Sequence, residues 1–170
     1  MNRDSDILLE RARNNAVKIS SGEVVNNNII KVVEFNLLTE KYAFEESYVS
    51  EILFLKELTP IPGTPSFVLG VVSYRSKILS IINIKLLFNI RDRGLSDLNK
   101  VIVLDNGRNY FGVVTDTITG IREIDLNFLT PPPINLDATE MEFISGVLPD
   151  GLILLNANKI LTSSKIIINQ

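Results

Sequence analysis

Short apolar runs separated by polar turns recur along most of this chain, and that pattern predicts a mainly β protein. Strongly turn-forming pairs such as Asn106-Gly107 lie between runs, which favours hairpins. The runs predict four hairpins, pairing residues 31–38 with 41–44, 67–74 with 77–82, 101–104 with 110–114, and 145–148 with 152–155.

A few segments depart from the strand pattern. Residues 83–88 and 156–161 each begin with an asparagine, a good helix N-cap, and predict short helices. Residues 48–53 have helical spacing in Val49, Ile52 and Leu53. Proline-rich stretches at 58–65 and 131–133 predict irregular connections, and residues 165–168 predict a closing strand.

The first part of the chain has a different pattern. Residues 5–17 predict an amphipathic helix with an apolar stripe made by Ile7, Leu8, Ala12 and Ala16. Polar residues follow at 20–23 and 26–28, as is typical of a linker. We therefore expect residues 1–28 to be an N-terminal helical extension and linker, and residues 29–170 to form the folded domain.

The folded domain contains a weak internal repeat. Gly70-Val71-Val72 matches Gly146-Val147-Leu148, and Ile81-Ile82-Asn83 matches Leu154-Leu155-Asn156. Small β units cover their edges by closing into barrels or by packing together. The repeat therefore predicts two pseudo-repeated β-barrel halves, at about 29–90 and 100–165, that share one core. Chance similarity among strands rich in isoleucine, leucine and valine is the alternative.

Composition narrows the function classes. The 170 residues include no cysteine and no histidine, which removes a thiolate nucleophile and the commonest general base and metal ligand. A net charge of −3 gives little support for nucleic-acid binding. The N-terminus has no signal-peptide pattern, and no apolar run approaches the length that crosses a bilayer. We expect a cytoplasmic protein without a cofactor or direct membrane insertion.

Enzyme motifs are absent: the chain has no G-x-S-x-G, Walker-type loop or G-x-G-x-x-G. Asp137, Glu140 and Glu142 could bind a hard cation, but they lack calcium-loop spacing, so a solvated loop is the better interpretation. Arg75, at the bend between two apolar strands, is more informative. It could form a bidentate ion pair with a carboxylate, for which Glu51 is a plausible partner, or it could be an ordinary surface arginine.

Two stretches carry a resemblance to a known family. The first half contains Thr59-Pro60-Ile61-Pro62-Gly63-Thr64-Pro65-Ser66-Phe67-Val68-Leu69-Gly70-Val71, followed by Arg75 and by Ile81-Ile82-Asn83. The second half contains Gly112-Val113-Val114-Thr115-Asp116 and Phe143-Ile144-Ser145-Gly146-Val147. Together these segments resemble the CheW-like domain, the coupling module of bacterial chemotaxis, over about residues 30–165.

The resemblance implies a fold and a function. It implies two five-stranded SH3-like β-barrels packed around a shared core, with short helices, and a scaffold without enzymatic activity. Such proteins bridge chemoreceptors to the regulatory domain of the histidine kinase CheA, and the groove between the barrels takes the receptor's helical cytoplasmic tip. The positions matching family residues linked to partner contact, or their counterparts in the other half, are Val49, Glu51, Ile52, Arg75, Ile118 and Ile121.

The sequence also departs from the family pattern. Ser76 stands where the family usually has a glycine, and Asn83-Ile84-Lys85 stands where it usually has Asp-Leu-Arg. These differences leave two alternatives open. One is a CheW-like regulatory module that binds a small ligand between the barrels. The other is a role in a related chemosensory pathway that controls surface motility or development.

Overall fold

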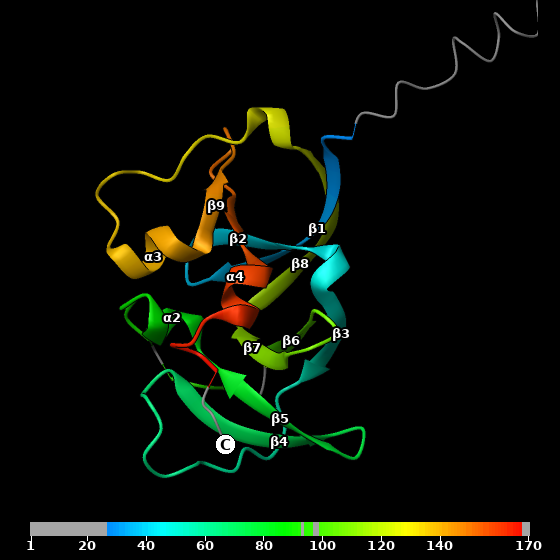
Figure 1. Cartoon of the computed structure of the whole chain (residues 1–170), viewed down its shortest axis with the longest axis vertical. Coiled ribbons are helices and arrows are strands. Elements are labelled where there is room, and N and C mark those ends of the chain that lie inside the picture. Colours follow the sequence, from blue (N-terminus) through cyan, green and yellow to red (C-terminus); the bar gives the residue numbers. More distant parts are fainter. Residues whose placement is uncertain (1–26, 93, 97–98, 168–170) are drawn as a thin grey trace, which may run out of the picture.

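The computed structural model describes residues 27–92, 94–96 and 99–167. The helix expected at 5–17 lies outside the described residues. Two five-stranded sheets make up most of the rest, and Figure 1 shows one above the other with short helices between and beside them. The strands are β1 (Ile29–Leu37), β2 (Glu40–Glu45), β3 (Val49–Phe54), β4 (Val68–Tyr74), β5 (Lys77–Ile82), β6 (Lys100–Asp105), β7 (Tyr110–Thr115), β8 (Thr117–Asp125), β9 (Ile144–Val147) and β10 (Ile153–Leu155).

Each sheet takes strands from both halves of the sequence. Sheet 1 has the order β8-β1-β2-β10-β9, and sheet 2 has the order β3-β6-β7-β5-β4. The hairpin β1–β2 therefore pairs with strands of the second half, and the hairpin β6–β7 pairs with strands of the first. Each half contributes its first hairpin to one sheet and its other three strands to the other sheet. The halves 29–90 and 100–165 consequently do not coincide with the two sheets.

Equivalent positions of the two halves make equivalent contacts. The backbone N–H of Asn83 donates to the carbonyl of Phe67 at 2.8 Å, and that of Asn156 donates to the carbonyl of Phe143 at 2.7 Å. Each asparagine side chain then accepts a backbone N–H in the first turn of a short helix, α2 (Ile84–Leu87) or α4 (Ala157–Thr162). Both expected asparagine caps are confirmed, and each satisfies an otherwise unpaired N–H of its helix.

Two glycines let the proline-rich connections lie against the sheets. Gly70 has φ +146°, and a Cβ there would collide with the carbonyl oxygen of Thr59. A Cβ on Gly146 would lie 2.6 Å from the carbonyl oxygen of Thr130. Both threonines precede a proline and make an isolated bridge to the neighbouring strand. Glycine is therefore required in both halves by the same close backbone approach.

The apolar side chains form three clusters. One lies within sheet 1 and includes Val32, Ala43 and Leu152, and another lies within sheet 2 and includes Leu79 and Val103. The largest joins the sheets, and its fully buried members include Phe35, Phe44, Ile84, Ile102, Leu104, Phe143 and Ile160. This third cluster is the shared core that was expected. Its members come from both sheets and from the helices α2 and α4.

Three local predictions need correction. Residues 48–53 are not helical, because a 3-10 turn, η1 (Glu46–Tyr48), leads directly into the strand β3. The residues of β3 are alternately half-buried and exposed. Residues 164–166 form a turn where a strand was expected from 165, with the N–H of Ile166 bonded to the carbonyl of Ser163 at 3.1 Å. An additional helix, α3 (Ala138–Phe143), occupies the acidic loop that follows the short 3-10 turn η2 (Leu126–Phe128).

The helix α3 also accounts for the acidic residues once considered for a cation. The Asp137 carboxylate accepts the N–H of Glu140 at 2.8 Å, and the Glu140 carboxylate accepts the N–H of Asp137 at 3.1 Å. This reciprocal pair is a capping box. Glu142 instead forms an ion pair with Lys165 at 2.7 Å. No helix was predicted here, although the Asp-x-x-Glu spacing of Asp137 and Glu140 is the sequence signal of a capping box.

Candidate partner-binding site

Arg75 lies at the tip of the β4–β5 hairpin. Arg75 and Ser76 both have left-handed backbone angles, with φ of 45° and 62°, as the two central residues of a type I′ turn require. The Arg75 Nη2 atom lies 2.8 Å from the Glu51 Oε2 atom on β3. The ion pair expected from the sequence is therefore present, and it ties the hairpin tip to a strand at the opposite edge of sheet 2.

Tyr74 completes this contact. Its hydroxyl donates to the same Glu51 oxygen at 2.6 Å, and this hydrogen bond is the main reason why the pKa of Tyr74 is raised. The Arg75 guanidinium also lies 5.3 Å from the centroid of the Tyr74 ring. The side chain of Arg75 remains 70 % exposed. The guanidinium is thus held in position while much of it stays available to a partner.

A groove of about 390 Å³ runs along the seam between β3 and β4, the two outer strands of sheet 2. Glu51, Ile52 and Arg75 all line it. Ile52 is 41 % exposed and Phe54 is 65 % exposed, so β3 presents apolar side chains to solvent. Exposed apolar residues beside a fixed arginine are typical of a protein-binding surface.

The other predicted residues lie on matching positions of the two outer strands β3 and β8. Val49 and Ile118 are half-buried and pack against the shared core. Ile52 and Ile121 lie three residues further along and are exposed, Ile121 by 59 %. Each outer strand therefore has one inward and one outward apolar residue, in the same order along the chain.

Strand β1 lies next to residues of both outer strands, β3 and β8. Val49 and Lys31 line one shallow surface hollow of about 470 Å³, together with Glu45 and Glu46. Across the β1–β8 pair, Lys31 lies opposite Glu123 and Val33 lies opposite Ile121. We call the residues around this hollow and their neighbours on β8 the β3–β8 face, formed by Ile30, Lys31, Glu45, Glu46, Val49, Ile121 and Glu123.

Sheet 1 has its own ion pair between an outer strand and a hairpin turn. Arg122 on β8 lies 2.8 Å from Asp150 in the β9–β10 turn and 3.1 Å from the buried Glu34 on β1. The polarity is reversed relative to Arg75 and Glu51, because here the strand supplies the cation and the turn supplies the anion. The two seams are thus closed by analogous but chemically distinct contacts.

A buried lysine that sequence reasoning missed joins the sheets. Lys85 on α2 has a side chain only 2 % exposed, and its Nζ atom lies 2.7 Å from Asp116 and 2.9 Å from Asp92. Burial favours a lower pKa for Lys85, but its bonds to the two carboxylates outweigh burial and raise the pKa. Asp116 also accepts the N–H of Leu38, whose φ is 56°, at 2.7 Å. This network fixes α2 against the β1–β2 turn.

Comparison with known proteins decides the family. Residues 31–165 match the family model described as the CheW-like domain, which spans most of the chain. The chain belongs to the CheW-like domain family.

No metal-binding group of three or more acidic, histidine or cysteine side chains occurs among the residues that the structure describes. No helix in that part of the chain is long and apolar enough to cross a membrane.

Individual CheW-like relatives agree with this assignment. The chain is 28 % identical to "Chemotaxis protein CheW" of Treponema pallidum over 149 residues, covering 84 % of this chain and 88 % of the relative. It is 31 % identical to "Protein FrzA" of Myxococcus xanthus over 121 residues, covering 69 % of this chain and 76 % of the relative.

A solved structure confirms the fold class. The scaffolding protein TtCheW from Thermoanaerobacter tengcongensis superposes with a TM-score of 0.67 at 30 % identity, over 75 % of this chain and 88 % of that chain. The mainly β fold with two packed sheets, expected from the sequence, is therefore the CheW fold, and its SH3-like barrel description is consistent with the two five-stranded sheets.

The two departures from the CheW-like pattern can now be placed. Ser76 holds the left-handed position in the β4–β5 turn for which glycine is better suited. Lys85 makes its two ion pairs without the planar fork of an arginine. Both changes lie in supporting positions, whereas Arg75 and Glu51 keep their contact.

Proposed function

We propose that this protein is a non-catalytic adaptor that couples chemoreceptors to a CheA-type histidine kinase in the cytoplasm. Membership of the CheW-like family, whose members are scaffolds, is the observation that carries the proposal. The exposed arrangement of Arg75, Glu51 and Ile52 supports it, because it offers a fixed cation beside apolar surface. Such surfaces bind proteins through a few anchoring side chains.

The proposal assigns separate surfaces to the two partners. The seam groove with Arg75 and Glu51 binds the regulatory domain of the kinase. The β3–β8 face, with Val49 and Ile121 and with Ile52 and Ile118 at its margins, binds the helical tip of the receptor. An amphipathic helix fits an apolar groove by placing residues of one face against it. Coupling then follows because one rigid module holds both partners.

Reconstitution tests this function. Kinase autophosphorylation is measured with the kinase alone, with receptor, with this protein, and with both together. The proposal predicts a change only when receptor and this protein are both present, and no turnover of ATP by this protein alone. ATP turnover by the purified protein, or an unchanged kinase rate in the full mixture, would contradict it.

The similarity to FrzA supports one alternative, a role in a related chemosensory pathway such as one controlling surface motility or development. The adaptor chemistry would be the same, with a different receptor and kinase. Affinity purification of the tagged protein from its native cells distinguishes the two. Recovery of the kinase of the main chemotaxis array favours the first role, and recovery of a paralogous kinase favours the second.

A further inference from the structure

A groove of about 300 Å³ lies between sheet 2 and the segment that follows α4, and we call it the sheet 2 groove. Its floor is formed by β5 and β7, through Ile78, Ser80 and Phe111 among others. Its walls come from the proline-rich connection, at Ile61, and from the segment after α4, at Ile166. None of its described lining residues belongs to the seam groove or to the β3–β8 face. The sheet 2 groove is therefore separate from the surfaces assigned to protein partners.

The lining of the sheet 2 groove is mainly apolar, and part of it is exposed. Ile78 is 65 % exposed and Tyr110 is 36 % exposed, although both side chains are large and apolar over most of their surface. Small-molecule sites are clefts of about 300–1,000 Å³ lined by apolar and aromatic side chains with a few polar groups. At the roughly 30 Å³ that a water molecule occupies in the liquid, this groove has room for about ten non-hydrogen atoms. Its size therefore suits a small ligand.

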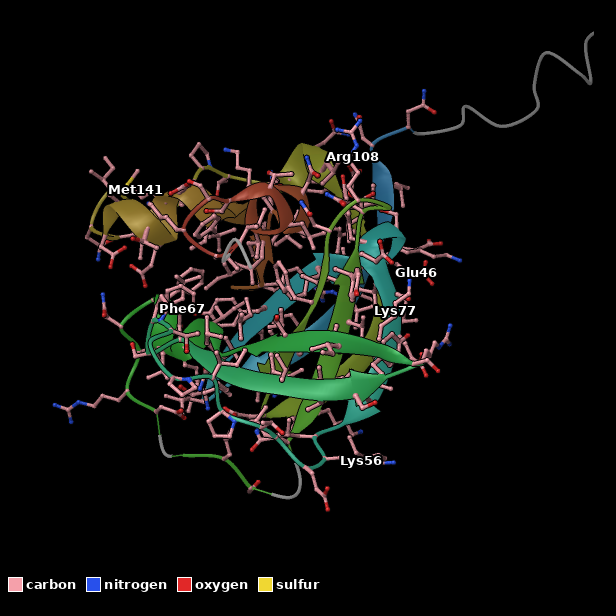
Figure 2. The ribbon with its side chains drawn as sticks, turned by 60° about the horizontal axis from the view of Figure 1, so that its bottom comes forward. Glu46, Lys56, Phe67, Lys77, Arg108 and Met141 are labelled. Carbon is pink, nitrogen blue, oxygen red and sulfur yellow. The ribbon has the colours of Figure 1, made fainter. Side chains whose placement is uncertain are left out.

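The charge in the sheet 2 groove is positive. Arg108, in the turn between β6 and β7, lines the groove, and none of the described lining residues is acidic. The Arg108 side chain forms no ion pair with a described residue. A second cation, Lys77, lies 5.4 Å from the centroid of the Tyr110 ring, which also lines the groove. Figure 2 shows Lys77 near the tip of the β4–β5 hairpin and labels Arg108. The carboxylate of Asp105, in the same turn as Arg108, accepts the N–H of Gly107 at 2.6 Å.

The turn holds the backbone of Arg108 in place. The Asn106 side chain accepts the backbone N–H of Arg108 at 3.0 Å and that of Asn109 at 2.9 Å. The Asn109 side chain donates to the carbonyl of Leu161 in α4 at 2.9 Å. The turn is thus tied to the helix beside the groove, and less order has to be gained when a ligand binds the guanidinium.

Sheet 1 has an equivalent groove, of about 450 Å³, beside the β1–β2 turn. Tyr42 and Ile153 line it, at positions that the repeat makes equivalent to two floor residues of the sheet 2 groove. Its turn charge is used within the fold, because Glu40 accepts the Tyr42 hydroxyl at 2.8 Å. Its second carboxylate, Glu140, belongs to the capping box of α3. By contrast, the turn of the sheet 2 groove supplies a cation with no such partner in the described part of the chain.

We propose that the sheet 2 groove binds a small apolar monocarboxylate, such as a medium-chain fatty acid, with its hydrocarbon chain over Ile78 and Phe111 and its carboxylate on Arg108. A guanidinium can match a carboxylate with two parallel hydrogen bonds. Removal of the hydrocarbon chain from water adds to the affinity in proportion to the apolar area that is buried.

Titration of the isotope-enriched, full-length protein with octanoate tests the site by amide NMR, at concentrations below micelle formation. Octanoate fits the size of the groove. Saturable shifts are expected at the amides of Ser80, Arg108 and Phe111. Octylammonium and 1-octanol have the same chain without the carboxylate, and they should bind at least about tenfold more weakly because they lack the charge-assisted bonds.

Two variants separate the charge from the apolar floor. Arg108→Gln should weaken octanoate binding about tenfold and leave the binding of 1-octanol unchanged. Ile78→Asn should weaken both ligands, and its exposed position allows the change without loss of the fold. Arg91→Gln is the matched control, because Arg91 is also an exposed arginine but does not line the groove. This control should bind octanoate as wild type does.

Several results would overturn the proposal. One is the absence of saturable shifts at the groove amides, and another is binding of octanoate by Arg108→Gln at full strength. Shifts spread over exposed apolar residues elsewhere, such as Ile134, would mean unspecific association only. Binding that appears only after residues 168–170 are removed would assign the groove to the end of the chain itself, which also overturns the proposal.

Discussion

The Lys85 Nζ atom lies 2.7 Å from the Asp116 Oδ1 atom, and this contact joins the two sheets. Lys85 belongs to α2, which follows sheet 2, whereas Asp116 lies at the entry to β8 of sheet 1 and binds the β1–β2 turn. The relative placement of the sheets sets the shape of the β3–β8 face, because β3 belongs to sheet 2 and β8 to sheet 1. The pair is therefore expected to determine both stability and the shape of the binding surface.

Replacing Lys85 by methionine should strongly destabilise the fold. The change keeps much of the side-chain volume but leaves the carboxylates of Asp92 and Asp116 without their cation. Breaking a buried ion pair in this way costs about 3–5 kcal/mol. Urea unfolding measures the loss. The control Lys165→Met breaks an exposed pair with Glu142 and should cost no more than about 1 kcal/mol. Equal effects would show that burial of Lys85 contributes nothing.

The same network predicts a dependence of stability on pH. Burial alone would raise the pKa of Asp92, but its bond to Lys85 lowers it, so the folded state holds the proton less tightly than the unfolded chain. Asp92 therefore stabilises the fold above its unfolded pKa, and this stabilisation disappears as pH falls through the lower folded value. Because the pKa of Lys85 is raised, its contribution disappears as pH rises through its folded value.

Urea unfolding at several pH values checks this expectation. The free energy of unfolding of wild type should fall more steeply below about pH 4 than that of Lys85→Met, in which Lys85 no longer lowers the pKa of Asp92 and only the hydrogen bonds from Asn83 and Gly94 still do. Parallel pH profiles for the two proteins would mean that Lys85 does not set the acid sensitivity of the fold.

Ser76→Gly should stabilise the protein, because Ser76 adopts a left-handed backbone conformation with φ of 62°. Relieving that strain is worth about 1 kcal/mol, or about 2–4 °C in melting temperature. Ser73→Gly in β4 is the control and should lower the melting temperature, since glycine weakens a strand. A fall in melting temperature for Ser76→Gly would show that the serine stabilises the turn by another contact.

Gly70→Ala should disrupt the packing of the proline-rich connection. The new methyl group would collide with the carbonyl of Thr59, which overpacks the site by about 1–3 kcal/mol. Gly120→Ala separates this collision from backbone strain, because Gly120 has a nearly equal φ of 149° but open space around it. Thermal melts should show the larger loss for Gly70→Ala, and equal losses would exclude the collision as the cause.

The sequence predicted most strands because turn residues such as those at 106–107 fix hairpins locally. It failed at 48–53 because Val49, Ile52 and Leu53 fit helical spacing, whereas a register shift between Val49 and Glu51 lets the same spacing serve a bulged outer strand. The exchange of hairpins between halves could not be predicted. A repeat shows which strands are equivalent and leaves open which of them pair.

The candidate site was predictable in part for a similar reason. Arg75 and Glu51 were paired correctly because both belong to the first half of the repeat, where Glu51 was a plausible carboxylate partner for a turn arginine. The roles of Tyr74 and Lys85 were missed. Lys85 reads as a surface residue of a short helix until the fold brings Asp92 and Asp116 around it.

The titration of Arg75→Ala against partner proteins tests the adaptor account most directly. Wild type should bind the cognate kinase regulatory domain and, separately, the receptor tip. Arg75→Ala should melt as wild type does, because the pair is exposed. Its binding to the kinase domain should weaken about 30-fold, corresponding to roughly 2 kcal/mol, and Arg75→Lys should recover only part of the loss. Failure of wild type to bind either partner, or full-strength binding of both by Arg75→Ala, would contradict the account.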